Sequence, residues 1–474
     1  MIRSRSPVLM AGLIIACGLA VSAQNAVIAP EDDGAGQKTA AVKEAPAAAP
    51  AAAAAKEVRP VSPAVEEKVV VIIDAVPQAV APVSVMGAEW GFFKDRREER
   101  DEDVIALLLP QLTDFIARYP DSEYAAEAQL LKAGFHLKTG DYKSAIVDLL
   151  RHVQEYPQAA SSAAAKKLLS ETAGDKTDKN TSALLAEMSK GAESADKAVK
   201  LAALLRKLSA KTGEMFYEPV VIEYREFFNR FPGYPENDEL FLTLADLHSK
   251  KGEYLSAKLA YQKMIQVYPA SPFLARAKRS LGAVLAERLK EYDDAIKVYK
   301  DITVSFPGTG EAWMSYHKLP KLLERQKQYD TAVVTYEEII SLYPDKEEAY
   351  DAFTAEAYVL REEMDKPAEA VAVLNRLADK YKGEKALEAL FLAAEIARKD
   401  IKDPGTEIKM YDRIVSEYPA DQQAPKALFA AAEVYEKEQK LDNAREYYTK
   451  ITEKYAENSL AKKARKRLDA LTGK

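Results

Sequence analysis

The sequence predicts an all-α solenoid built from repeated antiparallel helix pairs. The first observation is an aromatic residue followed by proline, which recurs along the 474 residues in steps of 37 or 38 residues, or of 75 where two units intervene. The second is helical spacing of the apolar residues between these pairs, and the third is small residues at two matched places in each unit. A fixed period in this range indicates stacked repeats. The pairs are Tyr119-Pro120, Tyr156-Pro157, Phe231-Pro232, Tyr268-Pro269, Phe306-Pro307, Tyr343-Pro344 and Tyr418-Pro419.

Each unit is expected to hold two helices joined by short turns, because 37 residues leave room for two helices of about four turns. A polar stretch such as Asp121-Ser122-Glu123 follows the proline, and its side-chain oxygens can cap the first helix. A turn such as Gly140-Asp141 separates the two helices. Proline ends the second helix, because the residue before it is pushed out of helical geometry.

Small residues at matched places let two antiparallel helices approach closely, while tyrosines in the second helix are expected to pack against the next unit. The small residues are Ala133, Ala245, Gly282, Ala357, Ala394 and Ala432 in the first helices, and Ala145, Ala257, Ala295, Ala332, Ala370 and Ala444 in the second. The tyrosines are Tyr261, Tyr299, Tyr336, Tyr411 and Tyr448.

This pattern of small residues, aromatic residue and closing proline resembles a tetratricopeptide repeat lengthened to 37 or 38 residues. The strings "YPASPFLARAKRSLGAVL" and "GEYLSAKLAYQKMIQVYP" are more narrowly similar to repeats of bacterial envelope proteins, such as the assembly lipoprotein of the Bam complex and the coordinator of the Tol-Pal system. The resemblance covers residues 100–474. It implies a right-handed superhelical solenoid of about nine to ten units, partial units included.

Some units depart from the pattern, and residues 158–194 depart most. Their second half lacks the aromatic residue and the closing proline, so a looser joint is expected there. Glu407 stands where alanine is usual, and Pro320 falls inside a first helix, which it should kink. The final helix, residues 458–471, carries lysines and arginines that suit the polar outer face of a solenoid cap.

The N-terminal 84 residues are expected to lie outside the repeats. Residues 1–23 fit a secretion signal, with Arg3 and Arg5 before an apolar run too short to be a comfortable membrane span. Two processing outcomes stay open: cleavage after Ala23, or lipid attachment at Cys17, the only cysteine, in a lipobox-like string. Residues 24–84 form an Ala- and Pro-rich linker with a short apolar segment at 68–76, which either packs on the first helices or pairs with a partner's sheet edge.

Composition and motifs argue against catalysis and against nucleic acid. The net charge is −7, which leaves no broad basic field for phosphates. The four histidines are far apart and none has the spacing of a zinc helix, so no metal, cofactor or catalytic residue is expected.

The binding surface is therefore expected on the first helices, which line the concave side of such arrays. Positions seven, ten and fourteen residues after a repeat-closing position share one helical face. We select Arg276, Arg279, His317, Lys321, Asp246, Tyr358 and Glu433 there. The four basic residues of this set fall in adjacent units and predict a local basic patch for an acidic peptide segment or a carboxylate terminus, unless the stripe is merely solvated.

These observations favour an exported, non-enzymatic and monomeric scaffold in the periplasm, tethered to the outer membrane if Cys17 is lipidated. Its partner would be a segment of another envelope protein, and the resemblance suggests outer-membrane assembly or a Tol-Pal role in division. The alternative is a structural spacer that associates with itself and has no peptide ligand. An enzyme with a cryptic site is the third hypothesis.

Overall fold

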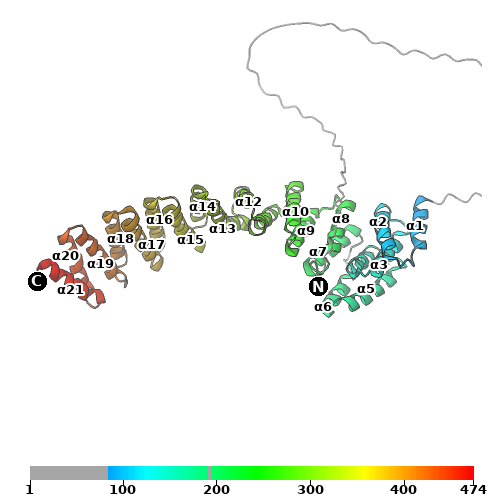
Figure 1. Ribbon diagram of the computed structural model, residues 1–474, viewed down its shortest axis with the longest axis horizontal. Helices are drawn as coiled ribbons and strands as arrows, with labels where there is room; N and C mark the ends of the chain where they lie inside the picture. The colour runs from blue at the N-terminus through cyan, green and yellow to red at the C-terminus, as the bar shows by residue number, and fades with distance from the viewer. Residues whose placement is uncertain (1–83, 191–193, 474) are drawn as a thin grey trace, which may run out of the picture. The chain divides into compact units, whose positions relative to one another are not determined.

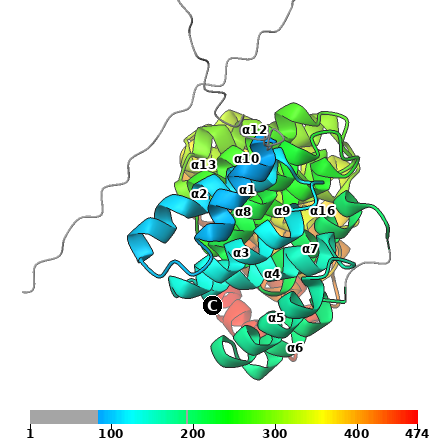
Figure 2. The same cartoon turned by 90° about the vertical axis from the view of Figure 1, so that its right-hand side faces the viewer.

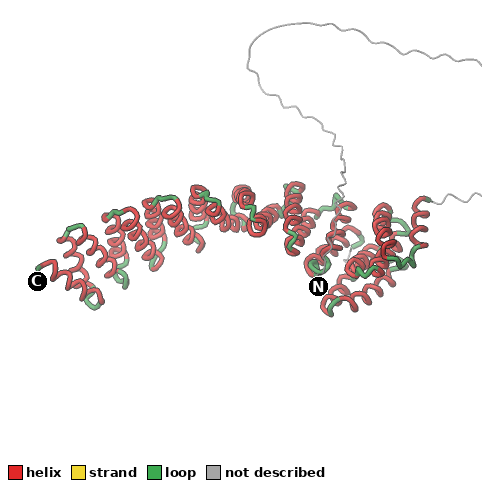
Figure 3. The backbone as a smooth tube through the Cα atoms, in the orientation of Figure 1, coloured by secondary structure: helices red, strands yellow, loops and turns green. Residues whose placement is uncertain are grey.

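The computed structural model describes residues 84–190 and 194–473, and every regular element in this part of the chain is a helix (Figures 1 and 3). The expectations for the signal segment, Cys17, the linker and the apolar segment at 68–76 fall outside the described residues. The predicted all-α repeat fold is confirmed.

The described helices form ten successive pairs and one closing helix. The first helices are α1 (Val85–Asp95), α3 (Ala125–Lys138), α5 (Ser162–Lys176), α7 (Lys197–Lys211), α9 (Asn237–Lys251), α11 (Leu274–Ala283), α13 (Gly310–Arg325), α15 (Glu347–Tyr358), α17 (Glu384–Ile396) and α19 (Ala424–Lys437). The second helices are α2 (Glu102–Arg118), α4 (Tyr142–Glu155), α6 (Lys179–Met188), α8 (Tyr217–Arg230), α10 (Tyr254–Val267), α12 (Tyr292–Ser305), α14 (Tyr329–Leu342), α16 (Pro367–Lys380), α18 (Pro404–Glu417) and α20 (Leu441–Lys454). The π-helical segments η1 (Val284–Leu289), η2 (Val359–Glu363) and η3 (Ala397–Ile401) extend α11, α15 and α17, and α21 (Ser459–Thr472) closes the array.

The aromatic residue of each aromatic-proline pair is the residue at which a helix ends, as predicted. Tyr119 and Tyr156 end α2 and α4, and the aromatic residues of the other five pairs end α8, α10, α12, α14 and α18. Tyr381, which lacks the proline, ends α16 with a fully extended ψ of 158° instead of the ψ near 50° seen at the others. Tyr455, which is followed by Ala456, nevertheless ends α20 with a ψ of 41°, so the proline alone does not fix how the chain leaves the second helix.

In seven of the ten described pairs, the turn between the two helices contains a residue in the left-handed region. Gly140 and Gly252 supply it with φ of 77° and 89°. The same place in five later units carries a side chain, with φ between 53° and 62°. Those residues are Lys290, Lys327, Asp365, Lys402 and Gln439. Non-glycine residues rarely adopt this geometry, so the packing of the two helices imposes it in those units.

The expected caps after the prolines are confirmed at α13, where the Thr309 hydroxyl accepts from the Ala312 backbone N–H at 3.2 Å, but not at α3 or α9. No side chain caps α3 or α9. Instead the Ser122 hydroxyl donates to the Tyr119 carbonyl at 2.9 Å, and the Asn237 amide donates to the Phe231 carbonyl at 2.9 Å. These side chains therefore satisfy free carbonyl groups at the end of the preceding helix, and not free N–H groups at the start of the next one.

The small residues are buried as predicted, and two of the tyrosines also contact the first helix of their own pair. Tyr299 lies over Gly282 of its own unit, where an added Cβ would come within 2.8 Å of the ring. Tyr261 donates its hydroxyl to Asp246 on α9, again within its own pair, at 2.5 Å. The ring thus covers the small residue of its own first helix, because that residue leaves the space for it.

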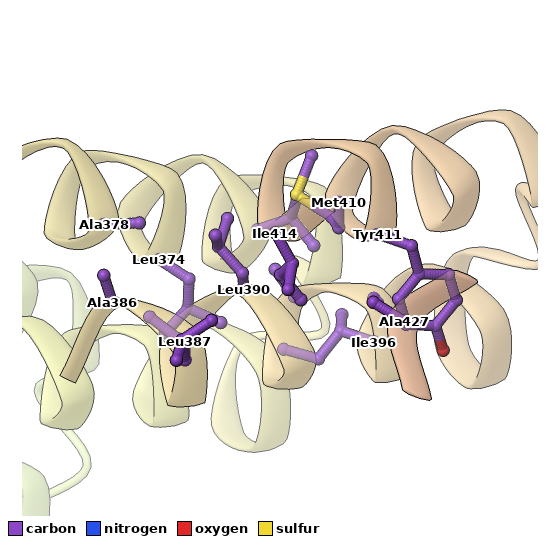
Figure 4. Close-up of a cluster of buried hydrophobic side chains, with 14 of the residues drawn as sticks. Leu374, Ala378, Ala386, Leu387, Leu390, Ile396, Met410, Tyr411, Ile414 and Ala427 are labelled. Atoms are coloured by element: carbon purple, nitrogen blue, oxygen red, sulfur yellow. The ribbon is translucent and has the colours of Figure 1, made fainter. Parts of the chain in front are cut away.

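Consecutive helices pack on one another through the array, and Figure 4 shows one stretch of the core, where Leu374 of α16, Leu387 and Leu390 of α17 and Ile414 of α18 meet. The order of packing changes at α4. That helix contacts α7 and α8 as well as α5, so the pair α5/α6 lies beside the stack and not within it (Figure 2). This pair coincides with the irregular unit of the sequence.

Candidate functional site

A groove runs over the first helices α11, α13 and α15, where two cavities adjoin. One has a volume of about 400 Å³ and lies between α11, α12, α13 and α15, and the other has about 230 Å³ and lies between α13, α14 and α15. Trp313, His317 and Glu348 line both cavities, so the two are continuous. A pocket of this kind, built from consecutive first helices, can hold a segment of polypeptide.

The floor and one wall of the groove are apolar and aromatic. Trp313 packs on Tyr343 with ring centroids 4.5 Å apart, which fixes its orientation. Met314, one residue on, is 53% exposed at the mouth of the larger cavity. Tyr336 and Ile339 are buried below, in the smaller cavity. An exposed methionine beside a fixed indole offers a surface to an apolar side chain.

Several cations near the groove already have carboxylate partners. Arg276 pairs with Asp246 at 2.7 Å, and Lys321 pairs with Glu324 at 3.2 Å. Lys318, which the sequence did not select, pairs with Glu287 at 3.3 Å. The positive charge of the predicted basic patch is therefore partly compensated.

Arg279 differs from these cations. It lines the larger cavity together with His317, and its Nε atom is buried without a hydrogen-bond partner within the described part of the chain. No carboxylate of the described residues lies within 4.0 Å of it. Because a guanidinium has five donors and gains from a planar anion, Arg279 is the cation in this groove best placed to receive a carboxylate.

Burial changes the pKa of one tyrosine that lines the groove. Burial, reinforced by Glu287, raises the pKa of Tyr299 to about 12 although Arg279 acts in the opposite direction. The tyrosine below Arg279 is therefore neutral at physiological pH and does not compensate the guanidinium. An anion that enters the cavity meets the guanidinium of Arg279, and the carboxylates of Glu287 and Glu348 line the same cavity.

The seven residues selected from sequence occupy four places. Arg279, His317 and Lys321 come together in the groove. Arg276 and Asp246 form a rung between α11 and α9, and Tyr358 is 57% exposed at the end of α15. Glu433 lies in a separate cavity of about 560 Å³ between α17, α18 and α19, which also contains the buried Glu407.

Sequence reasoning did not select Trp313, Met314 or Tyr336, which make the apolar part of the groove. Met314 sits seven residues after Pro307, a position that the selection rule used, and its apolar character at a predicted exposed site was the available signal. Trp313 and Tyr336 carried no such signal, because their exposure depends on the neighbouring unit.

Other kinds of site have little support in the described chain. No group of three His, Cys, Asp or Glu side chains in residues 84–190 and 194–473 could hold a metal ion. Within the same ranges no helix combines the length and the apolar character needed to cross a bilayer.

Two family models, each described as a tetratricopeptide repeat, match this chain. The first matches residues 109–160 and 242–309, and the second matches residues 321–346 and 426–458. These matches lie on the helix pairs described above, and they include α11 and the end of α13. No curated protein matches the chain.

Solved structures with a similar arrangement of helices share little sequence with it. The chain is similar to PilF of Pseudomonas aeruginosa at 15% identity, with 49% of this chain and 98% of that chain covered and a TM-score of 0.28. It is similar to PilW, titled a widely conserved type IV pilus biogenesis factor, at 13% identity over 48% of this chain and 99% of that one, with a TM-score of 0.27. A chain of the structure of Naa15/Naa10 bound to HypK-THB is similar at 14% identity. The match covers 82% of this chain and 64% of that chain, with a TM-score of 0.34.

Proposed function

We propose that this chain, which carries tetratricopeptide repeats, is a non-enzymatic scaffold that binds a segment of another protein in the groove over α11, α13 and α15. The observation that carries the proposal is Arg279. Its guanidinium lines a cavity beside Trp313 and Met314 and has no carboxylate partner within the described chain. Exposed apolar surface beside an uncompensated cation is what a short recognition segment needs.

The chemistry of the groove defines the segment that would fit. An aspartate, a glutamate or a free C-terminal carboxylate pairs with Arg279 and approaches His317. An apolar side chain next to it covers Trp313 and Met314. Such a complex weakens as ionic strength rises, because salt screens the exposed part of the charge pair.

The setting of the proposed function is the bacterial cell envelope. It is supported by the secretion-signal pattern of residues 1–23 and by the resemblance of the repeats to those of envelope proteins. The chain would act in the periplasm as a monomer, either soluble after cleavage behind Ala23 or anchored to the outer membrane through Cys17. Outer-membrane protein assembly and Tol-Pal-type constriction are the two processes that the resemblance suggests.

The test is affinity capture from the native envelope with the full chain as bait, followed by titration of peptides from the captured protein. Arg279→Glu should weaken peptide binding about tenfold or more, because it replaces a charge attraction by a repulsion. Lys297→Glu is the matched control, since Lys297 is a 75% exposed lysine on α12 of the same unit, and it should bind as the wild type does.

Two results would contradict the scaffold. Equal binding by the wild type and by Arg279→Glu would remove the groove as the binding site. Capture of the bait alone, together with oligomers in sedimentation, would replace the scaffold by the self-associating spacer.

A further inference from the structure

The joint at which α4 meets α8 contains a buried network of charged side chains. Asp148, Arg151 and Glu155 of α4 are each no more than 5% exposed, and Glu223 of α8 is 9% exposed. Lys132 of α3 is 6% exposed. Charges so deep in a helical array are costly unless each is paired.

Arg151 is the centre of the network. Its guanidinium is 3.1 Å from Glu155 on its own helix, 3.3 Å from Glu223, and in contact with Glu226, which belongs to α8 like Glu223. Arg230, also on α8, binds the other oxygen of Glu155. These contacts join helices 72 to 75 residues apart in sequence and bypass α5 and α6.

Lys132 extends the network to α3. Its ammonium is 3.0 Å from Asp148 and 3.8 Å from Glu226. One oxygen of Asp148 and one of Glu226 are nevertheless buried without a hydrogen bond in the described structure. α7 adds only leucines to the small cavity beside Arg151 and Glu223, so it supplies no further charge there.

The charges of this network do not balance. The cations are Lys132, Arg151 and Arg230, and the carboxyl groups are Asp148, Glu155, Glu223 and Glu226. Four ionised carboxylates would leave one negative charge in excess in a buried site. Glu223 and Glu226 share Arg151, and two carboxylates that share one cation do not both ionise readily.

We propose that the joint between α4 and α8 is a proton-controlled latch, tight when the pair Glu223/Glu226 holds one proton and loosened when that proton is lost. In the protonated state three carboxylates face three cations. In the deprotonated state a fourth carboxylate repels its neighbours across the interface of the two helices.

The direction of the pKa shifts agrees with this geometry. Burial raises the pKa of Glu223 to about 7, with Glu226 adding to the rise and Arg151 opposing it. Burial also opposes ionisation of Glu226, but Arg151 and Lys132 lower its pKa. A carboxyl whose folded pKa exceeds its unfolded value binds more protons when folded, so the stability of the joint falls as pH rises from about 4.5 to about 7.

Other titratable groups face the same interface. His136 of α3 lies 3.5 Å from both Asp148 and Asp141, and His152 of α4 binds the Ser161 hydroxyl at 2.9 Å. Burial lowers the pKa of His152 to about 4, so it stays neutral across the relevant range. Lys197 at the start of α7 pairs with Asp121, and Arg225 of α8, although exposed, adds its charge to those that lower the pKa of Glu226.

The experiment is amide hydrogen exchange of α4 and α8 in the full chain between pH 5 and pH 8, expressed relative to the rate of an unstructured peptide at each pH. The wild type should lose protection about tenfold or more over this range, because each unit of pKa shift corresponds to a factor of ten. Glu223→Gln replaces the carboxyl group by a neutral amide. This variant should therefore show the same amide protection at pH 8 as the wild type shows at pH 5. Glu218→Gln, an exposed glutamate on α8, is the matched control and should behave as the wild type does.

Several outcomes would overturn the latch. A wild type with pH-independent protection, or a Glu223→Gln variant that still loses protection, contradicts it. Loss of the pH dependence in His136→Asn would place the proton on His136 instead. If Glu223→Gln does not fold, carboxyl carbon NMR of the wild type with assigned side chains decides, since the proposal requires that Glu223 or Glu226 titrates near neutral pH and fails if neither does; Glu356 of α15, whose pKa burial raises to about 8, must be told apart from them.

Discussion

The joint between α4 and α8 and the regular array from α9 to α21 solve the same packing problem with different side chains. In the array, alanines such as Ala357, Ala394 and Ala432 are at most 2% exposed, and close helix approach needs no charge. At the joint, the helices meet through Arg151 and four carboxyl groups. The comparison shows that a repeat packs on small residues where its neighbour is in register, and on buried ion pairs where a unit has been displaced.

The position of the pair α5/α6 explains why charged side chains replace small residues at the joint between α4 and α8. Because α5/α6 lies beside the stack, α8 meets α4 from a unit two steps further along the sequence. The matched small positions no longer oppose each other there, and long side chains span the interface. Buried ion pairs give an interface less stability than apolar packing of equal volume, but they are strongly disfavoured once broken.

The largest effect is expected at the joint. Arg151→Ala leaves Glu155, Glu223 and Glu226 without their common partner, and we expect a loss of about 3–5 kcal/mol in the free energy of unfolding. Urea denaturation measures it, with Asn229→Ala, at an exposed position on α8, as the control. A loss below that of the control would show that the joint does not depend on the network.

The regular array should tolerate charge changes but not added volume. Ala432→Leu puts a large side chain where the exposed fraction is 0%, and overpacking is expected to cost about 1–3 kcal/mol. The melting temperature should fall accordingly, while Lys409→Leu on the exposed side of α18 should leave it nearly unchanged. An unaltered melting temperature for Ala432→Leu would mean that the pair α19/α20 is loosely packed.

A smaller effect is expected from the tyrosines of the array. Tyr261→Phe removes the hydroxyl that donates to Asp246 at 2.5 Å and should cost about 1 kcal/mol. The same change at Tyr254, whose hydroxyl has no hydrogen bond within the described chain, is the control for denaturant titration. Equal costs for the two variants would assign the tyrosine's contribution to its ring alone.

The smallest effect is expected at the exposed ion pairs that join neighbouring first helices. Arg276 is 50% exposed in its pair with Asp246, so Arg276→Ala should change the free energy of unfolding by less than about 1 kcal/mol. The change should shrink further in high salt, as measured by denaturation at two ionic strengths. A loss as large as that of Arg151→Ala would erase the distinction between the two regions.

Much of the fold could be read from single residues and their spacing. The aromatic-proline pairs end their helices because proline restricts the residue before it, wherever the chain lies. The alanine positions are buried because a 37-residue period repeats the same contact. The cap expected at α3 is absent, and so is one at α9, because Ser122 and Asn237 bond to carbonyls at the end of the preceding helix.

The candidate site was only partly accessible to the same reasoning. Arg279, His317 and Lys321 were selected because helical periodicity assigns a face to each residue within one helix. That Arg276 is paired while Arg279 is not depends on which carboxylate the preceding unit presents, and Trp313 becomes a groove wall only through its contact with Tyr343. Such facts involve two units at once.

The sequence by itself determined the local elements of this protein: where helices start and stop, which face of each is buried, and where the period fails. Only the tertiary structure decided that α4 skips a unit to meet α7 and α8, that three carboxyl groups converge on Arg151, and that Arg279 lines a cavity without a partner. The physical reason is range. Helix geometry acts over a few residues, whereas these pairings join side chains up to 75 residues apart and depend on how whole helices pack.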